Sequence, residues 1–319
     1  MENKNNPKIA VVVPCYNEEE VLPETIEVLS VFILDLMNRN IVSERSFLIF
    51  IDDGSKDKTW NIIETAAKKS NNIKGIKLSR NFGHQFALLA GMERIKDDCD
   101  IALTIDADLQ DEISVVEKGI EKMVNDGCDI IYFARRERKT DSLFKKVTAI
   151  LFYKIMILLG VDIVYNHADF RLVTKRILQE LISFKEVNLF LRAMLPIMGF
   201  KSEIIYYDRK ERLAGVSKYP FRKMLAFAWE GITSFSVAPL RFITILGFAV
   251  FFFSIIMGFY TLFEKFFGHG VVPGWASVVI PIYVLGGIMI FSLGIVGEYI
   301  GKIYKEVKRR PRYIVEKEV

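Results

Sequence analysis

Short apolar runs that end in polar residues recur through the first 135 residues of the chain. Continuous β-forming runs of this length predict buried strands, and segments with helical spacing of apolar residues separate them. The predicted strands are 8–14, 47–51, 73–78, 101–105 and 129–133, and the predicted helices are 18–37, 59–69, a segment ending at Ile95, and 115–124. This alternation predicts an α/β fold with a mostly parallel sheet and right-handed crossovers. The polar strand ends then meet at one edge of the sheet, where open α/β sheets bind ligands.

A different pattern begins at Ser142. Residues 143–159 are apolar on most of their surface, with lysines at positions 145, 146 and 154. Such a segment is typical of a helix in the membrane interface, and an ordinary buried helix or a subunit contact fits it equally well. Two helical segments, a strand near 204–207, a basic loop at 209–218 and a helix at 221–235 follow.

Two long uncharged segments come near the end of the chain. Residues 242–263 contain no charged side chain, and 22 residues at about 1.5 Å each extend roughly 33 Å, enough to cross a hydrocarbon core of about 30 Å. Residues 266–297 lack Asp, Glu, Lys and Arg, and we expect the second span at 277–299. Basic residues precede the first span and follow the second, whereas only Lys265 lies between them. The asymmetry predicts a transmembrane hairpin with both termini in the cytoplasm, and a basic tail, Arg312 included, that meets the anionic leaflet.

The composition also favours membrane contact. Hydrophobic residues make up 51% of the chain, and 25 phenylalanines are many for a soluble domain. The three cysteines lie far apart without a C-x-x-C pair, so neither a zinc site nor a disulfide framework is predicted. The polar start, 1–8, lacks the apolar core of a signal peptide. The net charge of +4 is mild, and we expect no nucleic-acid partner.

An acidic cluster, 106–111, follows the predicted strand 101–105. Asp106 and Asp108 offer oxygen ligands to a hard cation such as Mg²⁺ or Mn²⁺, which the phosphates of a nucleotide commonly complete. The alternative is a solvated turn between strand and helix, with Asp111 and Glu112 as charges at the helix start.

Two further motifs occupy equivalent places at the first two strands. The segments are 14–18, with the sequence PCYNE, and 52–55, with the sequence DDGS. Backbone amides and carboxylates at such strand ends can hold a nucleotide, although an ordinary turn also fits each motif alone. Neither G-x-G-x-x-G nor G-x-x-x-x-G-K-[ST] occurs, which argues against a dinucleotide-binding fold and a P-loop ATPase.

The motifs taken in order resemble those of family 2 glycosyltransferases with the GT-A fold. The resemblance is greatest to polyprenyl-phosphate glycosyltransferases, the group of dolichol-phosphate mannose synthases and bactoprenol glucosyltransferases. It covers nearly the whole chain through the segments 14–18, 52–55, 79–83, 106–111, 134–138, 167–172 and 212–219 and the two-span tail. It implies a Rossmann-like GT-A catalytic domain with a mostly parallel sheet at 1–220, an interfacial amphipathic helix at 221–240, two transmembrane helices at 241–302 and a basic cytoplasmic tail at 303–319.

The resemblance also implies roles for individual residues. The residues implied to cradle the base and ribose of a nucleotide sugar are Pro14, Tyr16, Glu18 and Asp53. Those implied to hold the metal and the diphosphate are Asp106, Asp108 and Gln110, with Arg212, Ser217 and Lys218 closing a loop over the same phosphates. Those implied to receive the acceptor phosphate are Arg135, Arg138 and Ser142. For His84 we favour a structural role.

The implied reaction is a single inverting displacement in which a lipid phosphate attacks the anomeric carbon of a hexose. A phosphate monoester has a second pKa of about 6, so it is already anionic at neutral pH and needs little help from a base. The residues expected to act in catalysis are Asp108, Arg212 and Asp169. Asp169 could act as a base, orient an arginine or bind a sugar hydroxyl.

UDP-glucose is the preferred donor and undecaprenyl phosphate the acceptor, because the two-span tail and the run 166–172 look more like the bactoprenol glucosyltransferases than the mannose type. N-acetylglucosamine, mannose and aminoarabinose donors stay open. We expect a multi-pass protein of the bacterial inner membrane that serves cell-envelope glycosylation as a homo-oligomer, a tetramer by resemblance.

Two other functions were weighed. A processive polysaccharide synthase would carry Q-x-x-R-W, which none of the three tryptophans matches, and two spans make a poor channel. A non-catalytic, membrane-anchored assembly protein with a degenerate transferase domain is disfavoured by the intact acidic motif.

Overall fold

The computed structural model describes residues 6–136, 167–187, 190–208, 233, 236–267 and 274–319. The chain divides into two compact units. Residues 1–157, 162–220 and 310–319 form the first, and residues 158–161 and 221–309 form the second.

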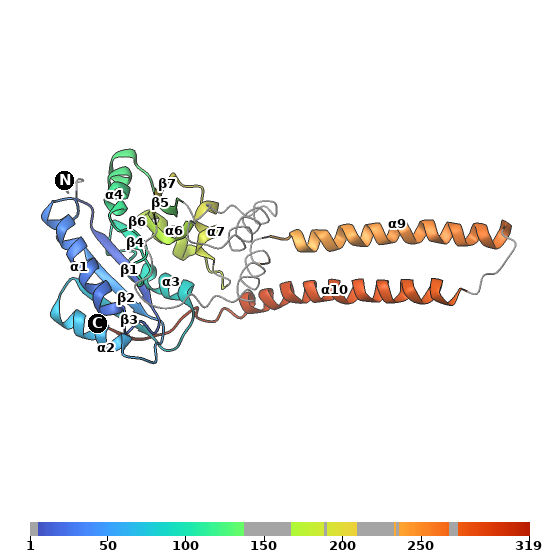
Figure 1. Ribbon diagram of the computed structural model, residues 1–319, viewed down its shortest axis with the longest axis horizontal. Helices are drawn as coiled ribbons and strands as arrows, with labels where there is room; N and C mark the ends of the chain where they lie inside the picture. The colour runs from blue at the N-terminus through green and yellow to red at the C-terminus, as the bar shows by residue number, and fades with distance from the viewer. Residues whose placement is uncertain (1–5, 137–166, 188–189, 209–232, 234–235, 268–273) are drawn as a thin grey trace. The chain divides into compact units, whose positions relative to one another are not determined.

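The first unit is built on one eight-stranded sheet in the described part of the chain, in the order β7-β5-β6-β4-β1-β2-β3-β8 (Figure 1). The strands are β1 Ile9–Cys15, β2 Phe47–Asp52, β3 Ile73–Leu78, β4 Ile101–Thr104, β5 Ile130–Arg135, β6 His167–Thr174, β7 Ser202–Tyr207 and β8 Val315–Glu318. Strands β4, β1, β2 and β3 are parallel to their neighbours in that run, and β5 is parallel to β7. β6 runs antiparallel to β4 and β5, and β8 runs antiparallel to β3. The sheet is GT-A-like and mostly parallel, as expected.

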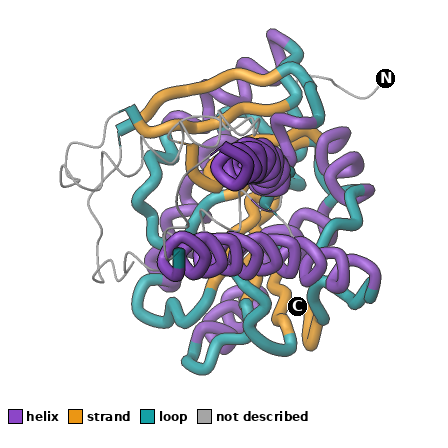
Figure 2. The backbone as a smooth tube through the Cα atoms, turned by 90° about the vertical axis from the view of Figure 1, so that its right-hand side faces the viewer, coloured by secondary structure: helices purple, strands orange, loops and turns teal. Residues whose placement is uncertain are grey.

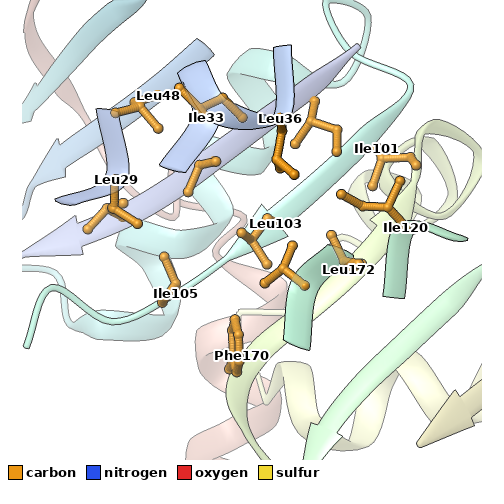
Figure 3. Packing of buried hydrophobic residues seen from close by; sticks show 14 of the residues in the cluster. Leu29, Ile33, Leu36, Leu48, Ile101, Leu103, Ile105, Ile120, Phe170 and Leu172 are labelled. Carbon is orange, nitrogen blue, oxygen red and sulfur yellow. The ribbon is translucent and has the colours of Figure 1, made fainter. Parts of the chain in front are cut away.

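Helices cover both faces of this sheet. The helices are α1 Leu22–Asn38, α2 Thr59–Lys69, α3 His84–Ile95, α4 Val115–Asp126, α6 Lys175–Ser183 and α7 Leu191–Ile197. α1, α2 and α4 share one hydrophobic cluster with the sheet, and Figure 3 shows Leu29, Ile33 and Leu36 of α1 against the strand side chains of this cluster. α3 packs on the other face so closely that a Cβ atom at Gly91 would lie 2.5 Å from Val12. The core thus holds the strand ends rigidly at one edge.

The five strands predicted from apolar runs are confirmed within two residues at each end, but β6 and β8 were not predicted. The segment of β6 carries His167, Asp169 and Arg171, and their side chains are all buried. Such charged positions hide the strand pattern in a sequence. β8 is exposed throughout and has no apolar face, so the predicted tail 303–319 instead contains the end of a helix and an edge strand.

The second unit contains the long helices α9 Ala238–Phe267 and α10 Trp275–Val307, which form a hairpin (Figure 1 and Figure 2). Both are long and apolar enough to cross a membrane, at Ala238–Tyr260 and Val284–Val307, with 0% and 6% of the respective window buried. The predicted spans 242–263 and 277–299 fall inside these helices. Near the open end of the hairpin, the Tyr299 hydroxyl donates to the carbonyl of Ser236 at 2.6 Å, and the Lys302 ammonium donates to the Thr233 hydroxyl at 2.6 Å.

Candidate active site

Two strands and one strand of opposite direction, β2, β4 and β6, bring acidic residues to the same edge of the sheet. Cys15 at the end of β1 is opposite Asp52, and Val12 is opposite Thr104 at the end of β4. β6 runs the other way, so its beginning, rather than its end, reaches this edge, with Arg171 opposite Thr104. Carboxylates from β2, β4 and β6 are therefore neighbours although they lie far apart in the sequence.

The loop after β1 is fastened to the loop after β2. The Asn17 amide donates to the Ser55 hydroxyl at 2.9 Å, and the Lys56 amide donates back to the Asn17 side-chain oxygen at 2.9 Å. The Glu18 amide donates to the Thr59 hydroxyl at 2.9 Å. Of the predicted nucleotide contacts, Pro14 is buried within β1, whereas Tyr16 is exposed on this fastened loop. The loop pair is therefore fixed before any ligand binds.

Asp53 holds the next loop. It is buried, and its two carboxylate oxygens accept hydrogen bonds from the amides of Phe82 at 2.7 Å and Gly83 at 2.9 Å. Burial raises the pKa of Asp53 in spite of these bonds. Next to it, Gly54 has φ +66° and lies so close to the backbone of Arg80 that a Cβ atom would meet its carbonyl carbon at 2.3 Å. Asp53 thus fixes the backbone of the loop after β3, which borders the predicted nucleotide site.

Asp106 and Gln110 present acceptor oxygens without donors. Asp106 Oδ1 and Gln110 Oε1 are buried and have no hydrogen-bond partner among the described residues. Burial raises the pKa of Asp106, nearby carboxylates led by Asp169 add to this, and His84 opposes it. Orphaned oxygens of this kind fit a hard cation. Within the described ranges no three His, Cys, Asp or Glu side chains are grouped as metal ligands, so phosphate oxygens would have to complete such a site.

Asp169 is the most heavily paired carboxylate of the site. It is 3% exposed and receives Arg171 Nη2 on Oδ1 at 2.5 Å and Arg192 Nη2 on Oδ2 at 2.9 Å. Gln85 Nε2 also donates to Oδ2, at 3.3 Å. Burial alone would raise the pKa of Asp169, but Arg192, His84 and Arg171 outweigh it and hold the pKa well below the ordinary value. An ionised carboxylate occupied in this way is suited to orienting guanidinium groups and is a poor general base.

His84, the first residue of α3, lies between the two carboxylates. Its Nε2 atom is 3.3 Å from Asp169 Oδ2 and 3.6 Å from Asp106 Oδ1. Burial lowers the pKa of His84, but Asp169 and Asp106 outweigh it and raise the pKa above the ordinary value. The sequence favoured a structural role for this histidine, and the structure places it inside the site.

Arg135, predicted to meet the acceptor phosphate, lies at the end of β5. Its Nη2 atom is 3.5 Å from Asp111 Oδ1, its Nε donates to the Tyr207 hydroxyl at 3.4 Å, and that hydroxyl donates to Asp111. Asp111, which the alternative interpretation made a helix-start charge, therefore fixes the arginine. The other predicted loop and acceptor residues lie outside the described residues, namely Arg138, Ser142, Arg212, Ser217 and Lys218.

Sequence reasoning missed several site residues. His84 and Gln85 directly follow the motif 79–83, so extending that motif by two residues would have included them. Tyr207 ends the predicted strand 204–207. Arg192 stands in no motif, and only the packing of α7 against β6 brings it to Asp169.

Two family models match the chain. Residues 10–182 match Glycosyl transferase family 2, and residues 238–303 match the GtrB C-terminal hairpin.

Relatives match along almost the entire length. An uncharacterized glycosyltransferase, YkoT, of Bacillus subtilis (strain 168) is 50% identical over 313 residues, 98% of this chain and 92% of the relative. The SfII prophage-derived bactoprenol glucosyl transferase of Shigella flexneri is 37% identical over 311 residues, 97% of this chain and 98% of the relative. Among solved structures, glucosyl-3-phosphoglycerate synthase from Mycobacterium tuberculosis in complex with Mn²⁺, UDP and phosphoglyceric acid has a TM-score of 0.48 at 18% identity, covering 72% of this chain and 78% of that one. A likeness at that level does not extend those ligands to this chain.

Proposed function

The chain belongs to glycosyl transferase family 2 and is a glycosyltransferase, and we propose that it transfers a hexose from a nucleotide sugar to undecaprenyl phosphate at the cytoplasmic face of the membrane. The observation that carries the proposal is the pairing of two unlike charge environments at one sheet edge. Asp106 and Gln110 present buried acceptor oxygens without donors in the described part of the chain, and Asp169 and Asp111 hold arginines. The first environment suits a cation and a diphosphate, and the second suits a phosphate monoester.

The nucleotide binds over the ends of β1, β2 and β3. Tyr16 is exposed there and offers a ring to a base, Glu18 lies on the fastened loop, and Asp53 keeps the loop after β3 in place. Because these loops are already bonded to each other, little conformational entropy is lost when the nucleotide binds.

The residues that would hold Mg²⁺ or Mn²⁺ are Asp106, Asp108 and Gln110. When bound, the cation supplies Lewis-acid stabilisation of the diphosphate that departs. Arg212, Ser217 and Lys218 are proposed to close over the same phosphates.

The attacking group is the lipid phosphate. It is anionic at neutral pH, so the arginines have to place it in line with the anomeric carbon without abstracting a proton. Arg135, with Arg138 and Ser142, performs this role. Asp169, ionised and engaged by two arginines, positions charge instead of acting as a base.

UDP-glucose is the donor we propose, because relatives that match nearly the full length are named bactoprenol glucosyl transferases. Donors of N-acetylglucosamine, mannose or aminoarabinose would use the same chemistry. The product would serve cell-envelope glycosylation.

We propose further that α9 and α10 cross the inner membrane. The first unit, which carries the candidate active site and is called the catalytic unit below, and both termini would lie in the cytoplasm. Beyond their own helix, no described residue lies within 4 Å of a Cβ added to the glycines of these helices, among them Gly258, Gly286 and Gly294, which leaves small-residue faces open for a homo-oligomer, a tetramer by resemblance. A monomer found by mass measurement in mild detergent would contradict the oligomer.

The test is a donor panel with the purified full-length protein, undecaprenyl phosphate and Mg²⁺ or Mn²⁺. We expect a lipid-linked sugar, formed fastest from UDP-glucose and lost on chelation of the cation. Asp108→Asn should lower the rate roughly 100-fold or more, because it removes a carboxylate that would hold the cation that stabilises the departing diphosphate. Asp126→Asn, the same change at an exposed position on α4, is the control and should leave the rate unaltered. Absence of product with every nucleotide hexose would contradict the proposed function.

A further inference from the structure

The sheet order separates the site into two sides. β1, β2 and β3, with the fastened loops, lie on one side of β4, and β6 and β5 lie on the other. Asp106 follows β4 and stands between them. The nucleotide occupies the β1 side in the proposed function, so the residues on β6, and those that contact it, face the acceptor.

Arg192 belongs to the acceptor side through Asp169. Its Nη2 lies 2.9 Å from Asp169 Oδ2, and its Nε lies 3.4 Å from Oδ1, so the two carboxylate oxygens contact one edge of the guanidinium group. The start of α7 is fixed beside it, because the Leu191 amide donates to Gln85 Oε1 at 3.1 Å while Gln85 Nε2 donates to Asp169. The position of this arginine is therefore set by the same carboxylate that anchors β6 in the site.

Two arginines share the Asp169 carboxylate. It is bonded by the guanidinium groups of Arg171 and Arg192, with His84 3.3 Å away on the same oxygen as Arg192. Arg171 is 1% exposed, whereas the Arg192 side chain is 29% exposed, so of these two arginines Arg192 is the one that reaches the surface. A partly exposed guanidinium held by a buried carboxylate is preorganised for an anion, and it can bind phosphate oxygens in a fork.

We propose that Arg192 is a further residue that contacts the phosphate monoester of the lipid acceptor, with Asp169 as its positioning residue. The inference rests on the proposed function. It adds a second cation on the β6 side to Arg135, which Asp111 holds at the end of β5. Arg192, held by Asp169, and Arg135, held by Asp111, would orient the attacking oxygen and offset its charge without protonating it.

The test separates binding of the acceptor from turnover. The full-length protein is titrated with farnesyl phosphate in the absence of donor, and then with UDP-glucose in the absence of acceptor. Arg192→Gln should weaken farnesyl phosphate binding roughly 10-fold or more, because a hydrogen bond to a charged group is lost, and should leave UDP-glucose binding within about twofold. Arg192→Lys should recover part of the affinity, because it keeps the charge and loses the fork. Asp169→Asn should weaken farnesyl phosphate binding as well.

Arg176→Gln is the matched control, since Arg176 is an exposed arginine on α6 whose guanidinium stacks on Phe200. It should alter neither titration. If Arg192→Gln does not fold, as judged by its thermal midpoint, the Arg192→Lys titration decides. Unchanged farnesyl phosphate affinity, or an equal loss of UDP-glucose affinity, would overturn the inference. Arg192-dependent binding of farnesyl phosphate without any sugar transfer would instead refute the proposed function and leave the phosphate site standing.

Discussion

Asp106 and Asp169 lie at the same sheet edge, yet their surroundings shift their pKa values in opposite directions. Burial, with other carboxylates nearby, raises the pKa of Asp106, whereas Arg192, His84 and Arg171 together lower that of Asp169. The first carboxyl therefore gains from an added cation, and the second is ionised without one. We propose that this contrast at single residues divides the site into a side for the diphosphate and a side for the acceptor.

The lowered pKa of Asp169 predicts a pH-dependent contribution to stability. Because the folded-state pKa lies below the unfolded value of about 3.9, the contribution is fully present above that value and is lost as pH falls through the folded-state pKa. Asp169→Asn should cost roughly 3–5 kcal/mol at neutral pH, since it removes the carboxylate that pairs with the buried Arg171.

Thermal unfolding of the full-length protein in detergent, followed from pH 7 down to pH 3, measures this. The gap in unfolding midpoint between the wild type and Asp169→Asn should narrow below about pH 4. A gap that stays constant over this range would show that Asp169 is not held ionised by its arginines.

The residue scale also shows what the sequence could predict. Asp106 and Asp108 were predicted because they follow a recognisable apolar strand, and Arg135 because its segment, 134–138, resembles a motif of the family. Arg192 could not be found, because its place depends on a contact between segments that are 23 residues apart. His84 was taken as structural since one histidine beside a turn gives no sign of two carboxylates that meet it from other strands.

At the scale of elements, the turn after β2 depends on a glycine. Gly54 combines φ +66° with the close approach of the Arg80 backbone. Gly54→Ala should therefore destabilise the fold in two ways, through backbone strain and through displacement of the loop after β3. We expect a lower unfolding midpoint and weaker UDP-glucose binding, because the displaced loop also carries the amides that hold Asp53.

Gly127→Ala is the control for this prediction. Gly127 has a similar φ of +64°, but nothing lies within 4 Å of an added Cβ. Its substitution should cost only about 1 kcal/mol of stability from the backbone conformation and leave UDP-glucose binding unaltered. Equal effects of the two substitutions on binding would contradict the role assigned to the close contact at Gly54.

The last strand joins the C-terminus to the catalytic unit. Val319 and Gly75 exchange two backbone hydrogen bonds, the Tyr313 hydroxyl donates to Glu93 at 2.7 Å, and Arg312 donates to the carbonyl of Phe184 at 2.9 Å. Arg312 was expected to meet lipid as part of the basic tail. That expectation is wrong for this residue, because its side chain is 11% exposed and is bonded within the catalytic unit.

Removing residues 311–319 should therefore destabilise the catalytic unit. We expect a lower unfolding midpoint and faster hydrogen exchange in β3 and α3, because both lose their partners from β8 and the residues before it. Lys317→Gln, an exposed change within β8, is the control and should have no effect. Unaltered exchange in β3 after the truncation would show that this strand pairing adds no stability.

Parts of the fold escaped prediction for a physical reason at this scale. The parallel strands are continuous apolar runs, and this pattern predicts strands that are buried on both faces of the sheet. β6 is equally buried, but its buried side chains include His167, Asp169 and Arg171, and Asp169 pairs with Arg171 and with Arg192 from α7. β8 is exposed and pairs through its backbone and through the ion pairs of Glu316 and Glu318. Local patterns do not reveal strands whose stability comes from distant partners.

The molecule as a whole combines a catalytic unit with two helices suited to lipid. Phenylalanines of α9, among them Phe248, Phe252 and Phe259, are mostly exposed, as expected for side chains that face acyl chains. A lipid-linked acceptor suits such a protein, because its phosphate stays at the membrane surface while its chain remains in the bilayer. The proposed acceptor would thereby be confined to two dimensions, which would raise its effective concentration at the enzyme.

The measurement that tests the account most directly is the structure of the product's new bond. The purified protein is supplied with UDP-glucose, whose sugar is α-linked, and undecaprenyl phosphate, and the lipid product is examined by ³¹P and ¹³C NMR. Direct attack by the phosphate on the anomeric carbon predicts a glucosyl phosphodiester with the β configuration. An α-linked product, or a sugar attached to anything other than the phosphate, would contradict the single displacement on which the assignment of both sides of the site depends.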